Sequence, residues 1–337
     1  MAGAFFGLGA GDSWSQFGVE RLQTRCSSPT VPHSLLQILI VSFCLVVAGC
    51  VEKSARPLES NLPGEPMGSV WKVTSPNGNH LYLCGTIHLL RQEDYPLPGA
   101  YDVAYADSQK LILELPPGSS EGGGMVLKMQ KLGLLPDGET LEGQVGPELA
   151  QSVFKWGEKH GQPAETLARY HPWFVALIIA AVEYGALGAQ PDKGVDQFYE
   201  SKAKQDNKPG VGLESVDFQL GLFAGLNTEQ QKDLLEQTLS EVKTISAEFT
   251  QMIEAWRAGD LDALSELLFR EADDYPHLME VFLHQRNRHW VPELEAALLS
   301  GPTAMVLVGA GHLAGDQGLI ALMKGRGFKI ERVSASP

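Results

Sequence analysis

Short runs of hydrophobic residues, bounded by turn-forming residues, lie toward the two ends of the chain. They are Ser69–Val73, His80–Cys84, Lys110–Leu115, Thr303–Val308 and Phe328–Val333. The first alternates apolar and polar positions, and the turn sequence Ser75-Pro76-Asn77-Gly78-Asn79 joins it to the second as in a hairpin. Lys110–Leu115 is a continuous apolar run of strand length, which is typical of a buried strand. We therefore expect a sheet built from both ends of the sequence.

Between these runs, from Met125 to about Leu299, apolar residues recur mostly at helical spacing. Helices are predicted over Trp173–Tyr184, Thr228–Lys243, Ser246–Ala258 and Leu261–Arg270 and, outside this section, over Ala100–Asp107 and Asp316–Lys324. One interruption, Lys208–Glu214, resembles a short strand that ends at an acidic residue. The pattern predicts an α/β (α+β) fold: a mixed central sheet built from N- and C-terminal segments, flanked by helices, with a long helical middle section. No second domain boundary is visible, so residues 68–334 are expected to form a single domain.

The N-terminal segment has the pattern of a lipoprotein signal peptide. Leu35–Gly49 is an apolar run, preceded by two arginines, that is shorter than the ~20 residues of a membrane-spanning helix. It ends at Val47-Ala48-Gly49-Cys50, which resembles a bacterial lipobox with Cys50 as the lipidated residue. We expect residues 1–50 to be a signal peptide and 51–67 a polar, proline-rich tether, with the protein lipid-anchored at the periplasmic or extracytoplasmic face of the bacterial cell envelope. The alternative is a transmembrane anchor with a chance cysteine.

Charge and cysteine content exclude two classes of protein. The formal net charge is −15, and residues 1–50 contribute none of it because their two acidic and two basic side chains cancel. An acidic chain repels phosphate, so we expect no nucleic-acid partner. Of the four cysteines, only Cys50 and Cys84 remain if the first apolar run is removed, so no disulfide framework is predicted.

Two histidines follow predicted strands in similar glycine turns, Gly85-Thr86-Ile87-His88 and Gly309-Ala310-Gly311-His312. The motif alone is weak, because 36 glycines and 9 histidines in 337 residues supply about one Gly-x-x-His by chance (9 × 36/337). A third match ends at His160 in a polar helical stretch without a preceding strand, and we interpret His160 as a solvated surface residue. Position distinguishes His88 and His312, because ligands bind at the carboxyl ends of strands in open α/β sheets.

Acidic residues end two further strands: Glu114 after Leu111-Ile112-Leu113, and Glu214 after Val211-Gly212-Leu213. If the four strand ends meet at one edge, two imidazoles and two carboxylates converge, which suits Zn, Mn, Co or Fe and an activated water. The alternatives are histidines that hydrogen-bond to the backbone and a glutamate that caps the next helix, as Glu214 before Ser215 could do.

Three other polar residues have two interpretations each. Asp196, in Gly194-Val195-Asp196 before a helix, either caps that helix or supports the site. Arg286 and Asn287 either bind a developing oxyanion or a substrate carboxylate, or form ordinary ion pairs on a helix surface.

Several residues are expected to be structural. Trp256 and Trp290 lie at helical positions typical of the core, and Cys84 lies inside a strand, where a buried cysteine is inert. The sequence contains no His-Glu-x-x-His helix, which excludes a zincin-type protease, and no Gly-x-Ser-x-Gly nucleophile turn.

Short motifs of the kinds described above follow one another along the chain. They are Trp71-Lys72-Val73, Leu83-Cys84-Gly85-Thr86-Ile87-His88, Leu111-Ile112-Leu113-Glu114, Gly194-Val195-Asp196, Gly212-Leu213-Glu214, Arg286-Asn287 and Val308-Gly309-Ala310-Gly311-His312-Leu313. In this order they resemble the TraB/GumN family, whose animal relatives are the Tiki metalloproteases, over Val70 to Val333. The resemblance implies that His88, His312 and Glu114 are metal-site components and that the ion is of the Mn or Co type. The wider superfamily includes erythromycin esterase-like and haem-binding ChaN-like proteins, so the fold does not fix the reaction.

The sequence therefore predicts a lipid-anchored, metal-dependent hydrolase, most simply a peptidase that acts on a peptide or protein substrate. His88, Glu114 and His312 would hold a divalent Mn, Co or Zn ion, and Glu214 would be a fourth ligand or the general base. Arg286 and Asn287 would orient the substrate or stabilise the oxyanion. The alternative is a non-catalytic envelope protein that sequesters a peptide signal or haem.

Overall fold

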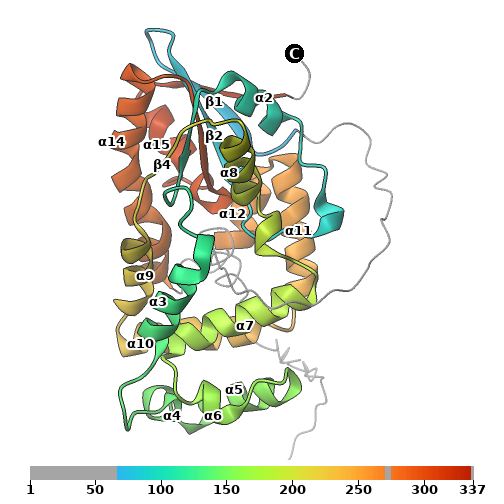
Figure 1. Cartoon of the computed structure of the whole chain (residues 1–337), viewed down its shortest axis with the longest axis vertical. Coiled ribbons are helices and arrows are strands. Elements are labelled where there is room, and N and C mark those ends of the chain that lie inside the picture. Colours follow the sequence, from blue (N-terminus) through green and yellow to red (C-terminus); the bar gives the residue numbers. More distant parts are fainter. Residues whose placement is uncertain (1–66, 270–274, 335–337) are drawn as a thin grey trace, which may run out of the picture. The chain divides into compact units, whose positions relative to one another are not determined.

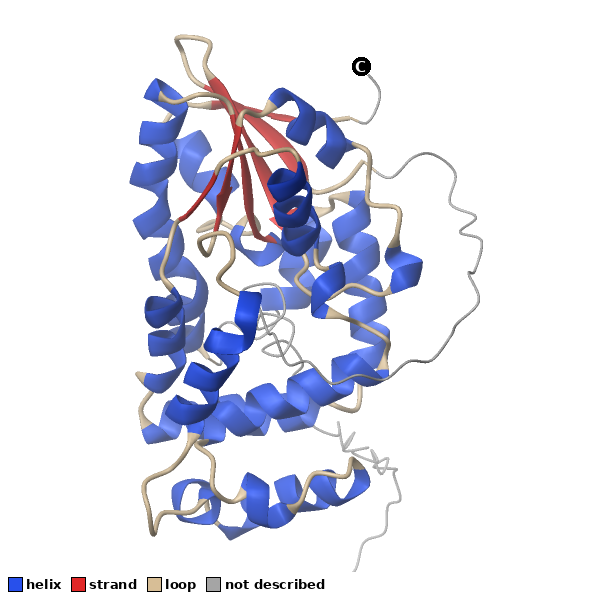
Figure 2. Ribbon diagram, in the orientation of Figure 1, coloured by secondary structure: helices blue, strands red, loops and turns tan. Residues whose placement is uncertain are grey.

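The computed structural model describes residues 67–269 and 275–334, and its strands form one six-stranded sheet (Figures 1 and 2). The strands are β1 (Val70–Thr74), β2 (His80–Thr86), β3 (Lys110–Leu113), β4 (Gly210–Gly212), β5 (Ala304–Gly309) and β6 (Lys329–Arg332). Each coincides with a strand expected from the sequence. The predicted mixed sheet, built largely from N- and C-terminal segments, is confirmed.

The order of strands across the sheet is β4-β3-β5-β2-β1-β6. β1 pairs antiparallel with β2 and with β6, whereas β2, β5, β3 and β4 pair with one another in parallel. Because parallel strands point the same way, the carboxyl ends of β2, β3, β4 and β5 lie at one edge of the sheet. We refer to this edge as the carboxyl edge.

Helices fill the section between β3 and β5, with β4 as the expected interruption. They are α3 (Gly124–Gly133), α4 (Leu141–Val145), α5 (Pro147–Lys159), α6 (Ala164–Leu167), α7 (Pro172–Ala186), α8 (Val195–Gln205), α9 (Val216–Ala224), α10 (Thr228–Glu241), α11 (Ile245–Ala258), α12 (Leu261–Phe269), α13 (Pro276–Met279) and α14 (Gln285–Ser300). Helix α2 (Ala100–Asp107) precedes β3, and α15 (Leu319–Gly325) precedes β6. Helix α15 begins three residues later than predicted, because Gly318 is the N-cap and its backbone is extended, so the helix starts only at Leu319.

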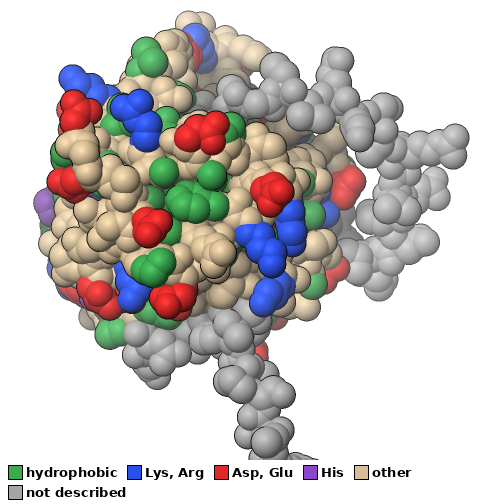
Figure 3. Space-filling model, turned by 90° about the horizontal axis from the view of Figure 1, so that it is seen from below, with side chains coloured by type: hydrophobic (Ala, Val, Ile, Leu, Met, Phe, Trp, Pro, Cys, Tyr) green, Lys and Arg blue, Asp and Glu red, His purple; other side chains and the backbone are tan. Residues whose placement is uncertain are grey.

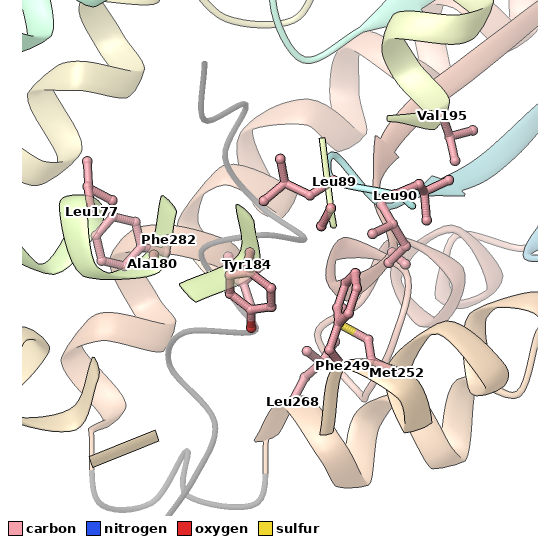
Figure 4. Close-up of a cluster of buried hydrophobic side chains, with 14 of the residues drawn as sticks. Leu89, Leu90, Leu177, Ala180, Tyr184, Val195, Phe249, Met252, Leu268 and Phe282 are labelled. Carbon is pink, nitrogen blue, oxygen red and sulfur yellow. The ribbon is translucent and has the colours of Figure 1, made fainter. Parts of the chain in front are cut away.

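The central strands β2, β3 and β5 are buried on both faces of the sheet, which explains why they are nearly all apolar. Leu83, Val306 and Trp290 belong to a cluster between the sheet and α14 and α15. The neighbouring Cys84 belongs to a larger cluster on the opposite face. That cluster continues beyond the carboxyl edge, where it includes Leu89 just after β2 and residues of α7 and α11 (Figure 4).

No helix in residues 67–269 or 275–334 is long and apolar enough to cross a membrane. The predicted signal peptide, its lipobox cysteine Cys50 and most of the predicted tether lie outside the described residues.

Candidate functional site

The four residues predicted to end strands lie together at the carboxyl edge. His88 follows β2, Glu114 follows β3, Glu214 follows β4, and His312 lies in η5 (Ala310–His312) directly after β5. Nε2 of His88 and Nε2 of His312 lie 3.8 and 4.0 Å from the same atom, Glu114 Oε1. All four side chains are buried. The sequence-based expectation that these strand ends converge therefore agrees with the structure.

A close approach of backbones sets the first histidine turn. A Cβ on Gly85 would lie 3.1 Å from Cα of Ala310, so glycine lets the two histidine turns lie side by side without displacing either backbone. The carbonyl oxygen of Gly85 accepts hydrogen bonds from the Tyr101 hydroxyl and from Trp256 Nε1, the latter at 2.8 Å. Trp256 is buried as expected, and it also anchors the strand end that leads to His88.

Asp196 on α8 orients His88. Its Oδ1 lies 2.9 Å from His88 Nδ1, so this nitrogen carries the proton and Nε2 faces Glu114. Gly194 is the residue at the helix N-cap, which corrects the interpretation of Asp196 as the cap. A Cβ on Gly194 would lie 2.4 Å from the carbonyl oxygen of His88, so this glycine allows α8 to approach the histidine turn.

Asn287 on α14 orients His312. Its Nδ2 donates to the carbonyl oxygens of His312 and Gln317, which leaves Oδ1 to accept from His312 Nδ1 at 2.6 Å. The lone pair on His312 Nε2 then accepts a hydrogen bond from Arg286 Nη1 at 3.1 Å. Burial, together with the nearby Arg286 guanidinium, holds the pKa of His312 well below its usual value, so this histidine is neutral.

Arg286 joins the two carboxylates. Its Nη2 donates to Glu114 Oε2 at 2.6 Å and to Glu214 Oε2 at 2.8 Å, and its Nε donates to Glu214 Oε1 at 3.0 Å. The side chain is 1% exposed, so the alternative of ion pairs on a helix surface does not hold for Arg286, nor for the equally buried Asn287. Burial lowers the pKa of Arg286, but Glu114 and Glu214 outweigh it and raise that pKa, so the guanidinium is charged.

Two side chains that the sequence analysis did not assign to the site complete it. Trp290 Nε1 donates to Glu214 Oε1 at 2.9 Å, and Gln219 Nε2 donates to Glu114 Oε2 and Glu214 Oε2 at 3.2 and 3.1 Å. Trp290 is buried as predicted, but its ring also packs 4.4 Å from that of His312. Gln219 stands five residues after Glu214, and no motif signalled it, because its role follows from the packing of α9 against the carboxyl edge.

The charges of this network affect His88. Burial lowers the pKa of His88, but the Asp196 carboxylate and, to a smaller extent, Glu114 outweigh this and raise its pKa above the usual value. The network contains three carboxylates, those of Glu114, Glu214 and Asp196, and one permanent cation, Arg286. A proton on His88 offsets part of the remaining negative charge, and a bound cation would offset it in the same way.

The donor atoms at the carboxyl edge are of the kinds that bind divalent metals, but they lie further apart than the ligands of a bound ion. Nε2 of His88 is buried and has no hydrogen-bond partner in residues 67–269 and 275–334, and both histidines have their Nδ1 held by an outer partner, as metal-binding histidines do. Neighbouring donors around a tetrahedral ion lie about 3.4 Å apart, compared with 3.8 and 4.0 Å here. In their present positions, no three or more His, Cys, Asp or Glu side chains of the described residues form a group that could hold a metal ion. Metal binding would require these side chains to move closer together and His312 Nε2 to give up its hydrogen bond from Arg286.

Two of the remaining candidates lie away from this network. Cys84 is fully buried in β2, and burial raises the pKa of its thiol well above the usual value, so it is not a nucleophile. His160 is only partly exposed: its ring stacks 4.8 Å from that of Trp156, and its Nε2 lies 3.3 Å from Glu183. His160 was predicted to be a solvated surface residue, and it is less exposed than that because it packs against Trp156 and lies close to Glu183 of α7.

A surface hollow of about 780 Å³ lies on helices α5 and α6 and not at the carboxyl edge. It is lined by Gln151, Ser152, Phe154, Lys155, Glu158, Gln162, Pro163 and Ala164 of α5, α6 and their connection. Figure 3 shows the end of the molecule seen from below, where hydrophobic side chains lie among acidic and basic ones.

With this arrangement in view, comparison with known proteins defines the class. The profile of the TraB/PrgY/gumN family matches residues 69–332, which include all the strands and the whole site, so the chain belongs to the TraB/PrgY/gumN family. The family resemblance inferred from the motifs is confirmed.

Two relatives illustrate the range of the family. The "Uncharacterized protein YbaP" of Escherichia coli (strain K12) is 26% identical over 255 residues, which cover 75% of this chain and 90% of that protein. "Metalloprotease TIKI2" of Danio rerio is 22% identical over 335 residues, which cover 83% of this chain and 64% of that protein. No solved structure matches the chain.

Proposed function

We propose that this chain is a metal-dependent hydrolase that cleaves peptide bonds at the carboxyl edge of its sheet. One observation carries the proposal: two imidazole nitrogens face a single carboxylate oxygen, with separations of 3.8 and 4.0 Å, in a buried network. The similarity to a protein named as a metalloprotease supports the choice of reaction.

In this proposal His88, Glu114 and His312 hold a Mn, Co or Zn ion. When bound, such an ion polarises a carbonyl group and lowers the pKa of water, which is the chemistry that peptide hydrolysis needs at neutral pH. Asp196 and Asn287 fix the ring nitrogens of His88 and His312 so that their lone pairs point inward.

Arg286 and Glu214 are the remaining charged residues: Arg286 would act on the substrate, and Glu214 would hold Arg286 in position. Arg286 is the buried donor that would stabilise negative charge on the substrate carbonyl oxygen as water adds to the carbonyl carbon. The C–N bond then breaks, and the leaving amine takes a proton derived from the water. Glu214 receives hydrogen bonds from Arg286, Trp290 and Gln219, which favours a role in positioning Arg286 over the roles of fourth ligand or general base.

The test is cleavage of a random peptide library by the purified full-length chain in detergent. We expect cleavage products, detected by mass spectrometry, when Mn²⁺, Co²⁺ or Zn²⁺ is present, and loss of cleavage on addition of a chelator. The variant His88→Ala should be inactive, whereas His160→Ala, which alters another Gly-x-x-His motif, should cleave normally. Cleavage that is unaffected by both the chelator and His88→Ala would refute the proposal.

We further propose that the chain is lipid-anchored through Cys50 and works at the periplasmic or extracytoplasmic face of a bacterial envelope. The support is the lipobox-like sequence Val47-Ala48-Gly49-Cys50 and the polar segment that follows it. Expression in bacteria with labelled palmitate should label the wild-type chain and not Cys50→Ser. Equal labelling of the two would contradict the anchor.

A second candidate is a binding protein that sequesters a peptide signal or haem without turnover. The observation in its favour is the hydrogen bond from Arg286 to His312 Nε2, which occupies the lone pair that a metal would need. Retention of intact library peptides by a metal-loaded chain that releases no products would favour this candidate.

A further inference from the structure

Gln219 is a buried side chain at the site with one polar atom, Oε1, that has no hydrogen-bond partner among the described residues. It lies on α9, whose start is fixed by Ser215, since the Ser215 hydroxyl accepts a hydrogen bond from the amide of Phe218 at 3.1 Å. One turn into the helix, Gln219 is 1% exposed, and its amide lies against the two carboxylates of Glu114 and Glu214. The uncharged Gln219 amide on α9 therefore lies within the charged network of Glu114, Glu214 and Arg286.

The orientation of this amide is fixed by its neighbours. The NH₂ group of Gln219 donates to Oε2 of Glu114 at 3.2 Å and to Oε2 of Glu214 at 3.1 Å. Exchanging the nitrogen and oxygen would place the amide oxygen against two carboxylate oxygens, none of which can donate a proton. Oε1 of Gln219 therefore points away from both carboxylates.

Gln219 Oε1 is left without a hydrogen-bond partner among the described residues. A buried acceptor with no partner is costly and needs an explanation, and beside a candidate site a donor from the ligand is one such explanation. The adjacent Glu114 is the carboxylate whose other oxygen faces His88 and His312. Gln219 therefore lies against the carboxylate that faces both histidines, on the side of its other oxygen.

We propose that Gln219 Oε1 accepts a hydrogen bond from the N–H of the peptide bond that is hydrolysed, and so selects amides over esters. This inference rests on the proposed function. The chemistry favours an N–H group because the nearby Glu114 and Glu214 carboxylates repel another acceptor. An ester has an oxygen in place of the N–H and would leave Oε1 unpaired, which is how hydrogen-bonding sites reject analogues.

The test compares a matched pair of substrates. The probes are the library peptide that the wild-type chain cleaves fastest and its depsipeptide, in which oxygen replaces the N–H of the cleaved bond. Gln219→Met removes the acceptor at similar volume, and we expect the ratio of kcat/KM for amide to that for ester to fall about tenfold, the effect of one hydrogen bond. Loss of fold or of metal would lower both rates and leave the ratio unchanged.

Gln231→Met is the matched control. Gln231 on α10 is also a buried glutamine whose Oε1 has no hydrogen-bond partner among the described residues, but its Nε2 donates to the carbonyl oxygen of Leu226 and not to the site. The Gln231→Met variant should have the same ratio of kcat/KM for amide to kcat/KM for ester as the wild type. Gln219→Asn withdraws the acceptor but keeps the amide, and it should lower the ratio if Gln219→Met does not fold.

The outcomes separate the two proposals. A wild-type chain that cleaves no peptide with any of the three metals contradicts the proposed function and this inference with it. A wild-type chain that cleaves peptides, together with an unchanged amide-to-ester ratio in the folded Gln219 variants, overturns the role of Gln219 alone. A lowered ratio in those variants and a normal ratio in Gln231→Met support it.

Discussion

Replacing Arg286 by Met removes the one permanent cation of the site while keeping most of the side-chain volume. The guanidinium lies 2.6 Å from Glu114 and 2.8 Å from Glu214, and all three side chains are buried. The substitution leaves both carboxylates without that cation, and breaking a buried pair in this way costs about 3–5 kcal/mol. A typical domain is stable by about 5–15 kcal/mol, so Arg286→Met should lose a large fraction of its free energy of unfolding.

The assay is urea denaturation of the full-length chain, followed by tryptophan fluorescence, in a chelator so that metal binding does not add to stability. Arg288→Met is the control, because Arg288 lies two residues away on the same helix, is largely exposed and pairs at the surface with Glu280. An exposed pair contributes about 1 kcal/mol or less. Arg286→Lys keeps the charge but loses the paired geometry and should fall between wild type and Arg286→Met. If Arg286→Met is no less stable than Arg288→Met, the charge network described here is wrong.

Two further predictions concern the support of His88. Gly194→Ala places a Cβ 2.4 Å from the His88 carbonyl oxygen, so we expect urea denaturation to show a loss of about 1–3 kcal/mol in the free energy of unfolding. Gly185→Ala on α7 is the control, because a Cβ there meets nothing within 4 Å, and it should lose no stability. Asp196→Asn weakens the interaction that raises the pKa of His88. Stability from a raised histidine pKa is fully present below the unfolded value of about 6.5 and is lost as pH rises through the folded pKa. Asp196→Asn should therefore destabilise the metal-free chain more at pH 5.5 than at pH 8.5, and an equal loss at both pH values would argue against a charged His88–Asp196 pair.

The convergence of four strand ends could be predicted from the sequence because a buried strand appears in the sequence as a short apolar run. The runs before Gly85, Glu114 and Gly309 are apolar after their first residue, which indicates strands covered on both faces. Parallel strands of that kind carry their following residues to one edge. The nature of the residues at those positions then indicated a site.

The helical contributions to the site could not be read in this way. Arg286 and Gln219 lie in helices, where an apolar period shows which face is buried but not which carboxylate that face meets. Arg286 was therefore compatible with a helix surface, and Gln219 carried no signal. Their roles follow from how α14 and α9 pack against the carboxyl edge, which depends on contacts between residues far apart in the sequence.

The central claim is that His88, Glu114 and His312 bind one divalent metal ion. Calorimetric titration of the metal-stripped full-length chain with Mn²⁺, Co²⁺ and Zn²⁺ tests it most directly. The account predicts one ion per chain for the wild type and for His160→Ala, and no binding at this site for His88→Ala or His312→Ala. A wild-type chain that binds none of the three ions, or histidine variants that bind as tightly as the wild type, would contradict it.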